Sequence, residues 1–189
     1  MNYKKTLFPA FIILALAQLY VPAGMILKQE NVLKTGKAFK FKTAPFDPYD
    51  PFRGKYIWLS FEANTVEVPV ESEWEYDAFV YVTLTTDKEG FAKIASVSEE
   101  KPTDSPDFVQ AKSWGKSTAD SLLTVNYLFD RFYMEESKAV EAEQTYVEAQ
   151  RDSSMIAYAL VKVKNGNAVI ENVFIDDVPI KKVVEKGRE

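Results

Sequence analysis

An uncharged apolar run near the N-terminus limits most strongly what this chain can fold into. It covers residues 7–27, follows two lysines, and contains one strongly polar residue, Gln18. Roughly 20 helical residues span the hydrocarbon core of a bilayer, so the run is just long enough to cross a membrane. Because it is not amphipathic, a core helix is disfavoured. We expect a basic tail over residues 1–5 and a transmembrane signal-anchor over residues 6–27.

A cleaved signal peptide is the alternative interpretation of the same segment. Residues 15–17, Ala-Leu-Ala, have the small-x-small form of a signal-peptidase site after a basic region and a short apolar stretch. Cleavage near residue 17 would release an exported domain. Strong hydrophobicity continues past that site to Leu27, as a membrane anchor requires, and we favour the anchor.

Composition excludes several classes of function. The chain has 189 residues, close to the length of one domain, and its net charge of -5 gives no basic surface for nucleic acid. It contains no cysteine, so it has neither a disulfide nor a thiolate metal site. It also contains no histidine, the commonest general base and metal ligand. We predict no catalytic residue, no metal site, no cofactor and no nucleic-acid partner.

A proline-rich stretch precedes the most distinctive strand. Pro45, Pro48 and Pro51 fix φ and remove backbone donors, which predicts an extended loop of defined shape. From Gly54 to Phe61 the residues are mostly aromatic or β-branched, with apolar side chains on both pleat faces. This pattern predicts a central, largely buried strand.

The sequence of this strand resembles a family signature. Residues 54–61 read Gly-Lys-Tyr-Ile-Trp-Leu-Ser-Phe, which is similar to the motif of the GDYXXLXY family of small bacterial membrane-anchored proteins. Its family positions here are Gly54, Lys55, Tyr56, Leu59 and Phe61. Lys55 replaces the family aspartate, which counts against carboxylate chemistry there, and Phe61 replaces the final tyrosine.

The resemblance extends beyond the motif. It includes Glu30 and Gly36 after the apolar segment, the Pro-Phe-Asp-Pro loop at 45–48, and blocks at 130–136 and 173–179. The family has no assigned reaction. The resemblance therefore implies an architecture and a location outside the cytoplasm, and no activity.

The charges around the apolar segment predict the opposite orientation in the membrane. Five lysines follow the segment and two precede it, so the positive-inside rule would place the C-terminal domain in the cytoplasm. The N-terminal layout is that of an export signal, and the resembling family is extracytoplasmic. We therefore expect a single-pass protein of the inner (cytoplasmic) membrane with its C-terminal domain on the extracytoplasmic side.

Strand patterns dominate the remaining chain. The predicted strands cover residues 39–42, 54–61, 78–85, 91–97, 108–114, 122–129, 155–163 and 168–175. Asn165-Gly166 predicts a tight hairpin turn, and residues 137–150 predict an amphipathic helix with Ser137 as its N-cap. We expect a mainly β (α+β) domain over residues 28–180, barrel-like or sandwich-like with one helix, and a charged solvated tail over residues 181–189.

Polar and aromatic residues in the proline loop form the first candidate binding surface. Asp47 and Asp50 could pair with Arg53, although aspartates in such turns usually bond to their own backbone. Tyr49 and Phe52 are the aromatic residues there most suited to exposure. Two carboxylates alone lack the six or more oxygen ligands that calcium prefers.

Arg131 is the second candidate. It precedes Glu135 and Glu136, with which it could form a polar site or ordinary surface ion pairs. Serine-lysine catalysis needs no histidine, but Ser60 and Lys55 lie at an odd spacing on one strand, so their side chains point to opposite faces.

Three functions remain open. The favoured one is a non-enzymatic, membrane-anchored extracytoplasmic domain that binds another envelope or membrane protein through the proline loop. An enzyme using carboxylate or serine-lysine chemistry would need polar side chains that converge in a cleft. A carrier of a small hydrophobic or lipid ligand would need a sizeable apolar cavity in the barrel.

Overall fold

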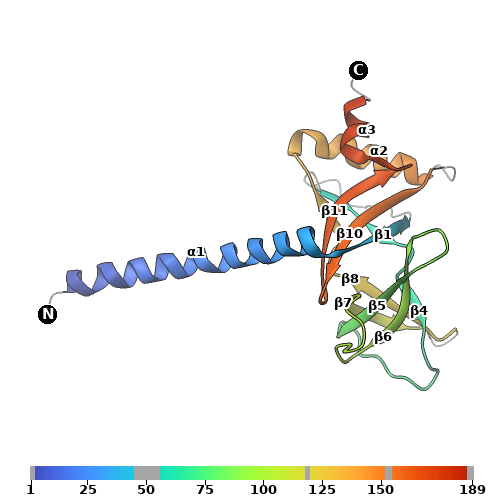
Figure 1. The fold of residues 1–189 in the computed structure, drawn as a ribbon, viewed down its shortest axis with the longest axis horizontal. Helices are drawn as coiled ribbons and strands as arrows, with labels where there is room; N and C mark the ends of the chain where they lie inside the picture. The colour runs from blue at the N-terminus through green and yellow to red at the C-terminus, as the bar shows by residue number, and fades with distance from the viewer. Residues whose placement is uncertain (1–2, 45–55, 118–119, 152–154, 187–189) are drawn as a thin grey trace.

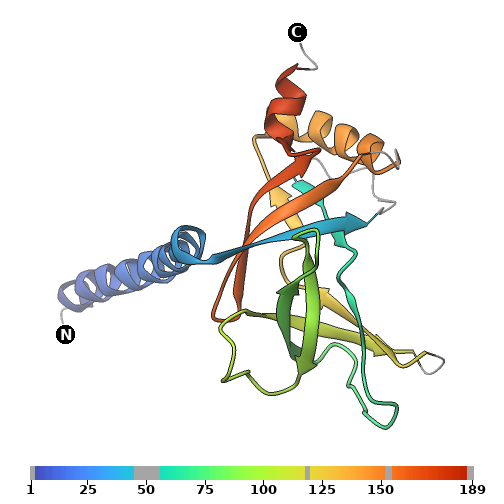
Figure 2. The same ribbon diagram turned by 45° about the vertical axis from the view of Figure 1, so that its right-hand side comes forward.

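A computed structural model of the chain describes residues 3–44, 56–117, 120–151 and 155–186. A single long helix, α1 (Tyr3–Thr35), projects from a mainly β domain, as Figures 1 and 2 show from two directions. Within the described residues, α1 supplies the one segment long and apolar enough to cross a membrane, residues 7–35. Its apolar window has a mean hydropathy of 2.1 and is not buried by the rest of the chain.

The helix joins the domain without a linker. The Gly36 N–H donates to the Val32 carbonyl at 2.8 Å, and the first strand begins at the next residue. Val32 is buried, and the Lys164 ammonium donates to the Thr35 hydroxyl at 2.6 Å. The negative C-terminal end of the helix dipole also stabilises a cation at this position. The end of α1 is thus part of the folded domain.

α1 leads directly into an antiparallel five-stranded sheet. Its order is β12-β11-β10-β1-β3, with β1 (Lys37–Ala44), β3 (Ser60–Phe61), β10 (Ala157–Lys164), β11 (Asn167–Ile175) and β12 (Val178–Pro179). β1 pairs with β10 in the register Phe39 opposite Val161, which confirms a strand at residues 39–42.

The second sheet forms a nearly closed five-strand barrel. Its order is β4-β8-β7-β5-β6, with β4 (Thr65–Glu67), β5 (Phe79–Thr86), β6 (Ala92–Ser98), β7 (Phe108–Lys116) and β8 (Leu122–Tyr127). Consecutive strands pair as antiparallel hairpins, β5 with β6 and β7 with β8. The mainly β, barrel-like prediction is confirmed.

Two helices cover the end of the first sheet that lies away from the barrel (Figure 1). α2 (Glu136–Arg151) confirms the predicted helix, but it begins one residue before Ser137, which is therefore not its N-cap. Its Ala139, Ala142 and Tyr146 are buried. The expectation of a solvated tail from residue 181 is wrong for residues 181–186. They continue a short helix, α3 (Ile180–Lys186), because two apolar side chains four residues apart pack into the core.

Aromatic rings fill the space where the two sheets meet. Phe41 lies 5.3 Å, centroid to centroid, from both Phe61 and Phe129, and Tyr127 lies 5.0 Å from Phe129. Most pairs are tilted or edge-to-face, the arrangements that aromatic side chains prefer. This cluster joins the first sheet to the barrel.

The Asn165-Gly166 turn fastens the two sheets at a second place. Both residues have positive φ, 49° and 84°, as a two-residue hairpin of this type requires. The Gly166 N–H donates to the Phe108 carbonyl, and its own carbonyl accepts from the Gln110 N–H at 3.0 Å. The predicted turn is confirmed, and it also contacts β7.

The motif strand differs from its prediction. It divides at Leu59 into β2 (Tyr56–Trp58) and β3, which pair with different partners, β9 (Arg131–Tyr133) and β1. The face carrying Ile57, Leu59 and Phe61 is buried, whereas Tyr56, Trp58 and Ser60 are only partly covered. The strand is therefore not buried on both faces, because β2 lies in a two-stranded ribbon and not within a central sheet.

Candidate functional site

The β2–β9 ribbon presents four side chains on its outward face. Tyr56 lies opposite Tyr133, and Trp58 lies opposite Arg131. The residues between them, Ile57 and Phe132, pair with each other and point into the core. Since side chains alternate along a strand, the inward pair fixes the outward direction of the other four.

Arg131 lies over two of these aromatic rings. Its guanidinium carbon is 5.3 Å from the Tyr56 ring centre and 5.2 Å from the Trp58 ring centre. The Tyr56 and Tyr133 rings are 5.5 Å apart, and Tyr133 is 63% exposed. Stacking on aromatic faces orients the guanidinium, whose N–H groups donate within the plane of the group.

Asp130 is the acidic neighbour of this arginine. Its Oδ1 lies 3.6 Å from the Arg131 Nε, a distance compatible with ion pairing but long for a hydrogen bond. A hydrogen bond with Tyr133, followed by the charge of Asp130, raises the pKa of Arg131 above its usual value. The guanidinium is therefore a permanent cation at any accessible pH.

A groove continues from the ribbon toward the barrel. It encloses about 250 Å³ and is lined by residues of β2, β3, β7 and β8. Its polar and aromatic lining includes Trp58, Ser60, Asn64, Trp114, Asn126 and Asp130. Trp58 and Asp130 belong to both features, so groove and cluster are continuous.

An exposed aromatic pair borders this groove. Trp114 is 52% exposed, and its ring centre lies 5.1 Å from that of Tyr76. We call the outward surface made by Tyr56, Trp58, Trp114, Arg131 and Tyr133 the motif face. Aromatic and arginine side chains supply most of the energy in protein interfaces, so the motif face has the composition of a contact surface.

The described residues of the motif face and its groove offer binding groups and no pair of carboxyl groups. Among the described residues that line the groove, Asp130 supplies the one carboxylate and lies beside Arg131. General acid–base chemistry on two carboxyl groups would require a second. The arrangement is suited to holding a partner group, such as a carboxylate against the guanidinium.

Comparison with known families agrees with the motif. The profile of the GDYXXLXY family, described as GDYXXLXY protein, matches residues 18–173. The chain belongs to the GDYXXLXY family. The match runs from the middle of α1 into β11 and includes every residue of the motif face. Neither the comparison with curated proteins nor that with solved structures found a match.

The predicted site residues of this GDYXXLXY domain have different outcomes. The loop residues Asp47, Tyr49, Asp50, Phe52 and Arg53 lie outside the described residues, as do Gly54 and Lys55 of the motif. Their assignment stays a prediction. Of the described motif positions, Leu59 and Phe61 belong to the core, and Tyr56 belongs to the motif face.

The acidic neighbour of Arg131 differs from the ones that the sequence suggested. Its acidic neighbour is Asp130, and the Glu135 carboxylate instead lies 4.0 Å from the Lys138 ammonium. The side chain of Glu136 is not described. The sequence did not predict the aromatic partners of Arg131, since Trp58 and Arg131 lie 73 positions apart and no local pattern links them.

Trp114, Asn64 and Asn126 were not predicted as site residues. Trp114 follows the buried Ser113 on β7 and sits at the end of an expected strand, where it resembles an ordinary sheet residue. The available signal was the β7–β8 pairing combined with strand alternation, which places Trp114 on the face opposite to the core.

A second cavity of apolar character lies away from the motif face. It encloses about 470 Å³ between α2, α3 and the β11–β12 turn, and its lining includes Ala149, Met155, Ile175, Val178 and Val183. The carrier hypothesis requires a cavity within the barrel, whereas this one lies under the helices. Its volume is within the range of small-molecule sites.

Proposed function

We propose that this GDYXXLXY protein is a non-enzymatic, single-span membrane protein whose extracytoplasmic domain binds another envelope or membrane protein. The observation that carries the proposal is the motif face, with an exposed stacked arginine beside a groove. α1 supports the anchor, because it is long and apolar enough to cross a membrane.

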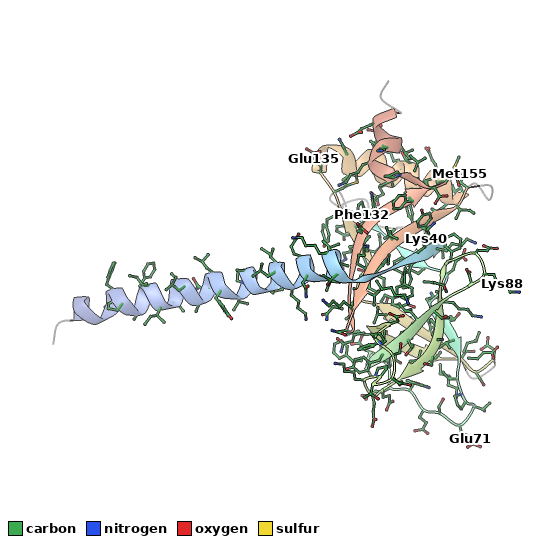
Figure 3. All side chains as sticks on the ribbon, in the orientation of Figure 1. Lys40, Glu71, Lys88, Phe132, Glu135 and Met155 are labelled. Carbon is green, nitrogen blue, oxygen red and sulfur yellow. The ribbon has the colours of Figure 1, made fainter. Side chains whose placement is uncertain are left out.

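The position of β9, which carries Arg131 and Tyr133, favours a partner in the same membrane. Phe132, the inward neighbour of Arg131 on β9, lies on the side of the domain from which α1 extends, and so does Glu135 (Figure 3). Lys88 lies on the opposite side (Figure 3). A surface on the α1 side would be close to the bilayer, where membrane-embedded partners expose their loops.

The chemistry of the motif face favours an extended acidic segment of that partner. Arg131 can bind a carboxylate with two parallel N–H groups, and the aromatic rings supply apolar contact. In the sequence, the proline loop directly precedes Tyr56 of the motif face. Asp47, Tyr49, Asp50, Phe52 and Arg53 are proposed to extend the contact surface.

Site-specific photo-cross-linking in intact cells tests this function. A photoreactive residue replaces Tyr133 on the motif face in one variant and Lys88 on the far side in the control. We expect a discrete adduct from position 133 alone, and the loss of that adduct when Arg131→Ala is added. Equal adducts from both positions, or no adduct from position 133, would exclude the motif face as the contact surface, whereas an adduct that survives Arg131→Ala would exclude Arg131 as the residue that holds the partner.

The apolar cavity under α2 and α3 supports a second candidate, the binding of a small hydrophobic ligand. Its volume of about 470 Å³ and its apolar lining are the observations in favour. Native mass spectrometry of the detergent-purified full chain tests it. A bound lipid that disappears in Ala149→Trp supports a carrier, whereas a lipid-free wild type removes the idea.

A further inference from the structure

Gln18 lies near the centre of the proposed membrane span. It is one residue from the midpoint of the apolar run 7–27. Its amide has both donor and acceptor groups, and within the described chain no side-chain hydrogen bond joins it to another residue. Hydrocarbon offers no water to satisfy such a group.

Pro22 adds a second unsatisfied group at the same turn. In an α-helix the N–H of residue 22 would donate to the carbonyl of residue 18, but proline has no N–H. The backbone carbonyl of Gln18 therefore lacks its intrahelical donor. Side-chain amide and free carbonyl together form one polar locus in an otherwise apolar segment.

Proline within transmembrane helices is tolerated where a neighbouring helix or a side chain satisfies the freed carbonyl. Within the described chain, no other element covers the apolar window of α1, which is unburied along its whole length. The groups that satisfy the locus must therefore come from another molecule in the bilayer, unless Gln18 folds back on its own carbonyl and leaves the rest of its amide unpaired.

We propose that α1 pairs in the membrane with α1 of a second copy of this chain through Gln18. This inference rests on the proposed membrane anchor. A second copy in the same orientation presents the same amide at the same depth, and a glutamine pair is self-complementary because each amide can donate to the carbonyl oxygen of the other.

The helix surface around Gln18 suits such a contact. Residues three and four positions away share its face, and these include Leu14, Ala15 and Val21. Ala15 is small, so it permits close approach of the two backbones beside the glutamine pair. Leu16 lies on nearly the opposite face, since two residues correspond to about 200° of rotation.

The absence of cysteine makes the pairing directly measurable. In the full-length chain in native membranes, Leu14→Cys and Leu16→Cys each introduce one thiol, at positions of equal residue type and similar exposure, 58% and 61%. Under mild oxidation we expect a disulfide-linked dimer from Leu14→Cys and little from Leu16→Cys. Adding Gln18→Leu to Leu14→Cys should lower the dimer yield by about threefold or more, because the interhelical hydrogen bonds are lost.

Alkaline extraction of the same membranes separates the two proposals. Gln18→Leu makes the span more apolar, so each variant should remain in the membrane fraction. Retention in the membrane with equal cross-linking at positions 14 and 16, or with no effect of Gln18→Leu, would overturn the pairing and leave the anchor intact. Release of the wild-type chain from the membrane, or a mature chain lacking the apolar segment, would overturn both.

Discussion

Arg131 lies with its guanidinium carbon 5.2 Å from the centre of the Trp58 ring, directly across the β2–β9 ribbon. The strand that carries the family motif is thus joined to the block at residues 130–136 through an exposed cation on aromatic rings. In this position the motif residues contribute a surface as well as a fold.

Replacement of Arg131 by lysine should weaken partner binding nearly as much as replacement by alanine. Lysine keeps the charge but loses the planar group that stacks on Tyr56 and Trp58 and binds a carboxylate with two N–H groups. Melting temperature should change little, because the side chain is on the surface. The yield of the Tyr133 cross-link measures binding, and full recovery with lysine would show that charge alone suffices.

Gly166→Ala should destabilise the domain more than Gly90→Ala. Both glycines have nearly the same positive φ, 84° and 87°, so each substitution costs about 1–2 kcal/mol in backbone strain. At Gly166 the new Cβ would also lie 2.8 Å from a ring carbon of Phe108, whereas nothing lies within 4 Å at Gly90. Chemical denaturation should show an extra loss of about 1 kcal/mol or more for Gly166→Ala; equal losses would contradict the close contact.

Gly36→Ala should separate α1 from the domain. A Cβ there would lie 2.5 Å from the Val32 carbonyl oxygen and 3.0 Å from that of Val163, both backbone atoms. We expect faster tryptic cleavage near Lys34 and Lys37 in detergent, with a stability loss of about 1–3 kcal/mol. Gly24→Ala is the control, since nothing lies within 4 Å of its Cβ, and it should leave cleavage unchanged.

The hydrogen bond from Tyr158 to Asp177 should determine part of the loss of folding stability at low pH. The Tyr158 hydroxyl donates to Asp177 Oδ1 at 2.6 Å, and this bond, followed by the charge of Lys40, lowers the pKa of Asp177 below 3.8. A lowered carboxyl pKa stabilises the fold above the unfolded-state pKa, and that contribution is lost as the pH falls through the folded-state value.

Tyr158→Phe removes the largest cause of the shift, so its stability at neutral pH should be lower and should fall less on acidification. Melting temperatures at about pH 6 and about pH 2.5 measure the difference. A wild type and a variant with parallel acid profiles would show that the bond does not act on Asp177.

Ser113→Ala should stabilise the protein. The Ser113 side chain is fully buried, and its hydroxyl has no hydrogen-bond partner among the described residues. Removal of an unpaired buried hydroxyl should recover about 1 kcal/mol of desolvation. The contrast is Thr43→Val, which removes a buried hydroxyl that donates to the Ala157 carbonyl at 2.9 Å and should therefore destabilise. A loss of stability in Ser113→Ala would reveal a missing partner.

Patterns within short stretches of sequence correctly predicted a hairpin turn and two helices. Asn165-Gly166 defined a hairpin turn because few residues adopt positive φ, and the apolar stripe on residues 137–150 defined α2. The long uncharged segment defined α1. Each of these signals lies within one short stretch of chain.

Pairing between strands that are distant in sequence could not be predicted from such local patterns. The division of the motif strand at Leu59 depends on β1 and β9, whose residues are distant in sequence. For the same reason Trp58 and Tyr56 read as core residues, and the partners of Arg131 were not anticipated. α3 was missed because its charged residues hid the two apolar positions, Ile180 and Val184, that hold it to the core.

The junction at Gly36 has a mechanical consequence. Because α1 enters β1 at the next residue, and Thr35 accepts a hydrogen bond from Lys164 of β10, we expect helix and domain to turn together. A rotation of α1 about its axis would turn the motif face through the same angle. The orientation of this surface toward its neighbours is thus set by how the helix sits among them.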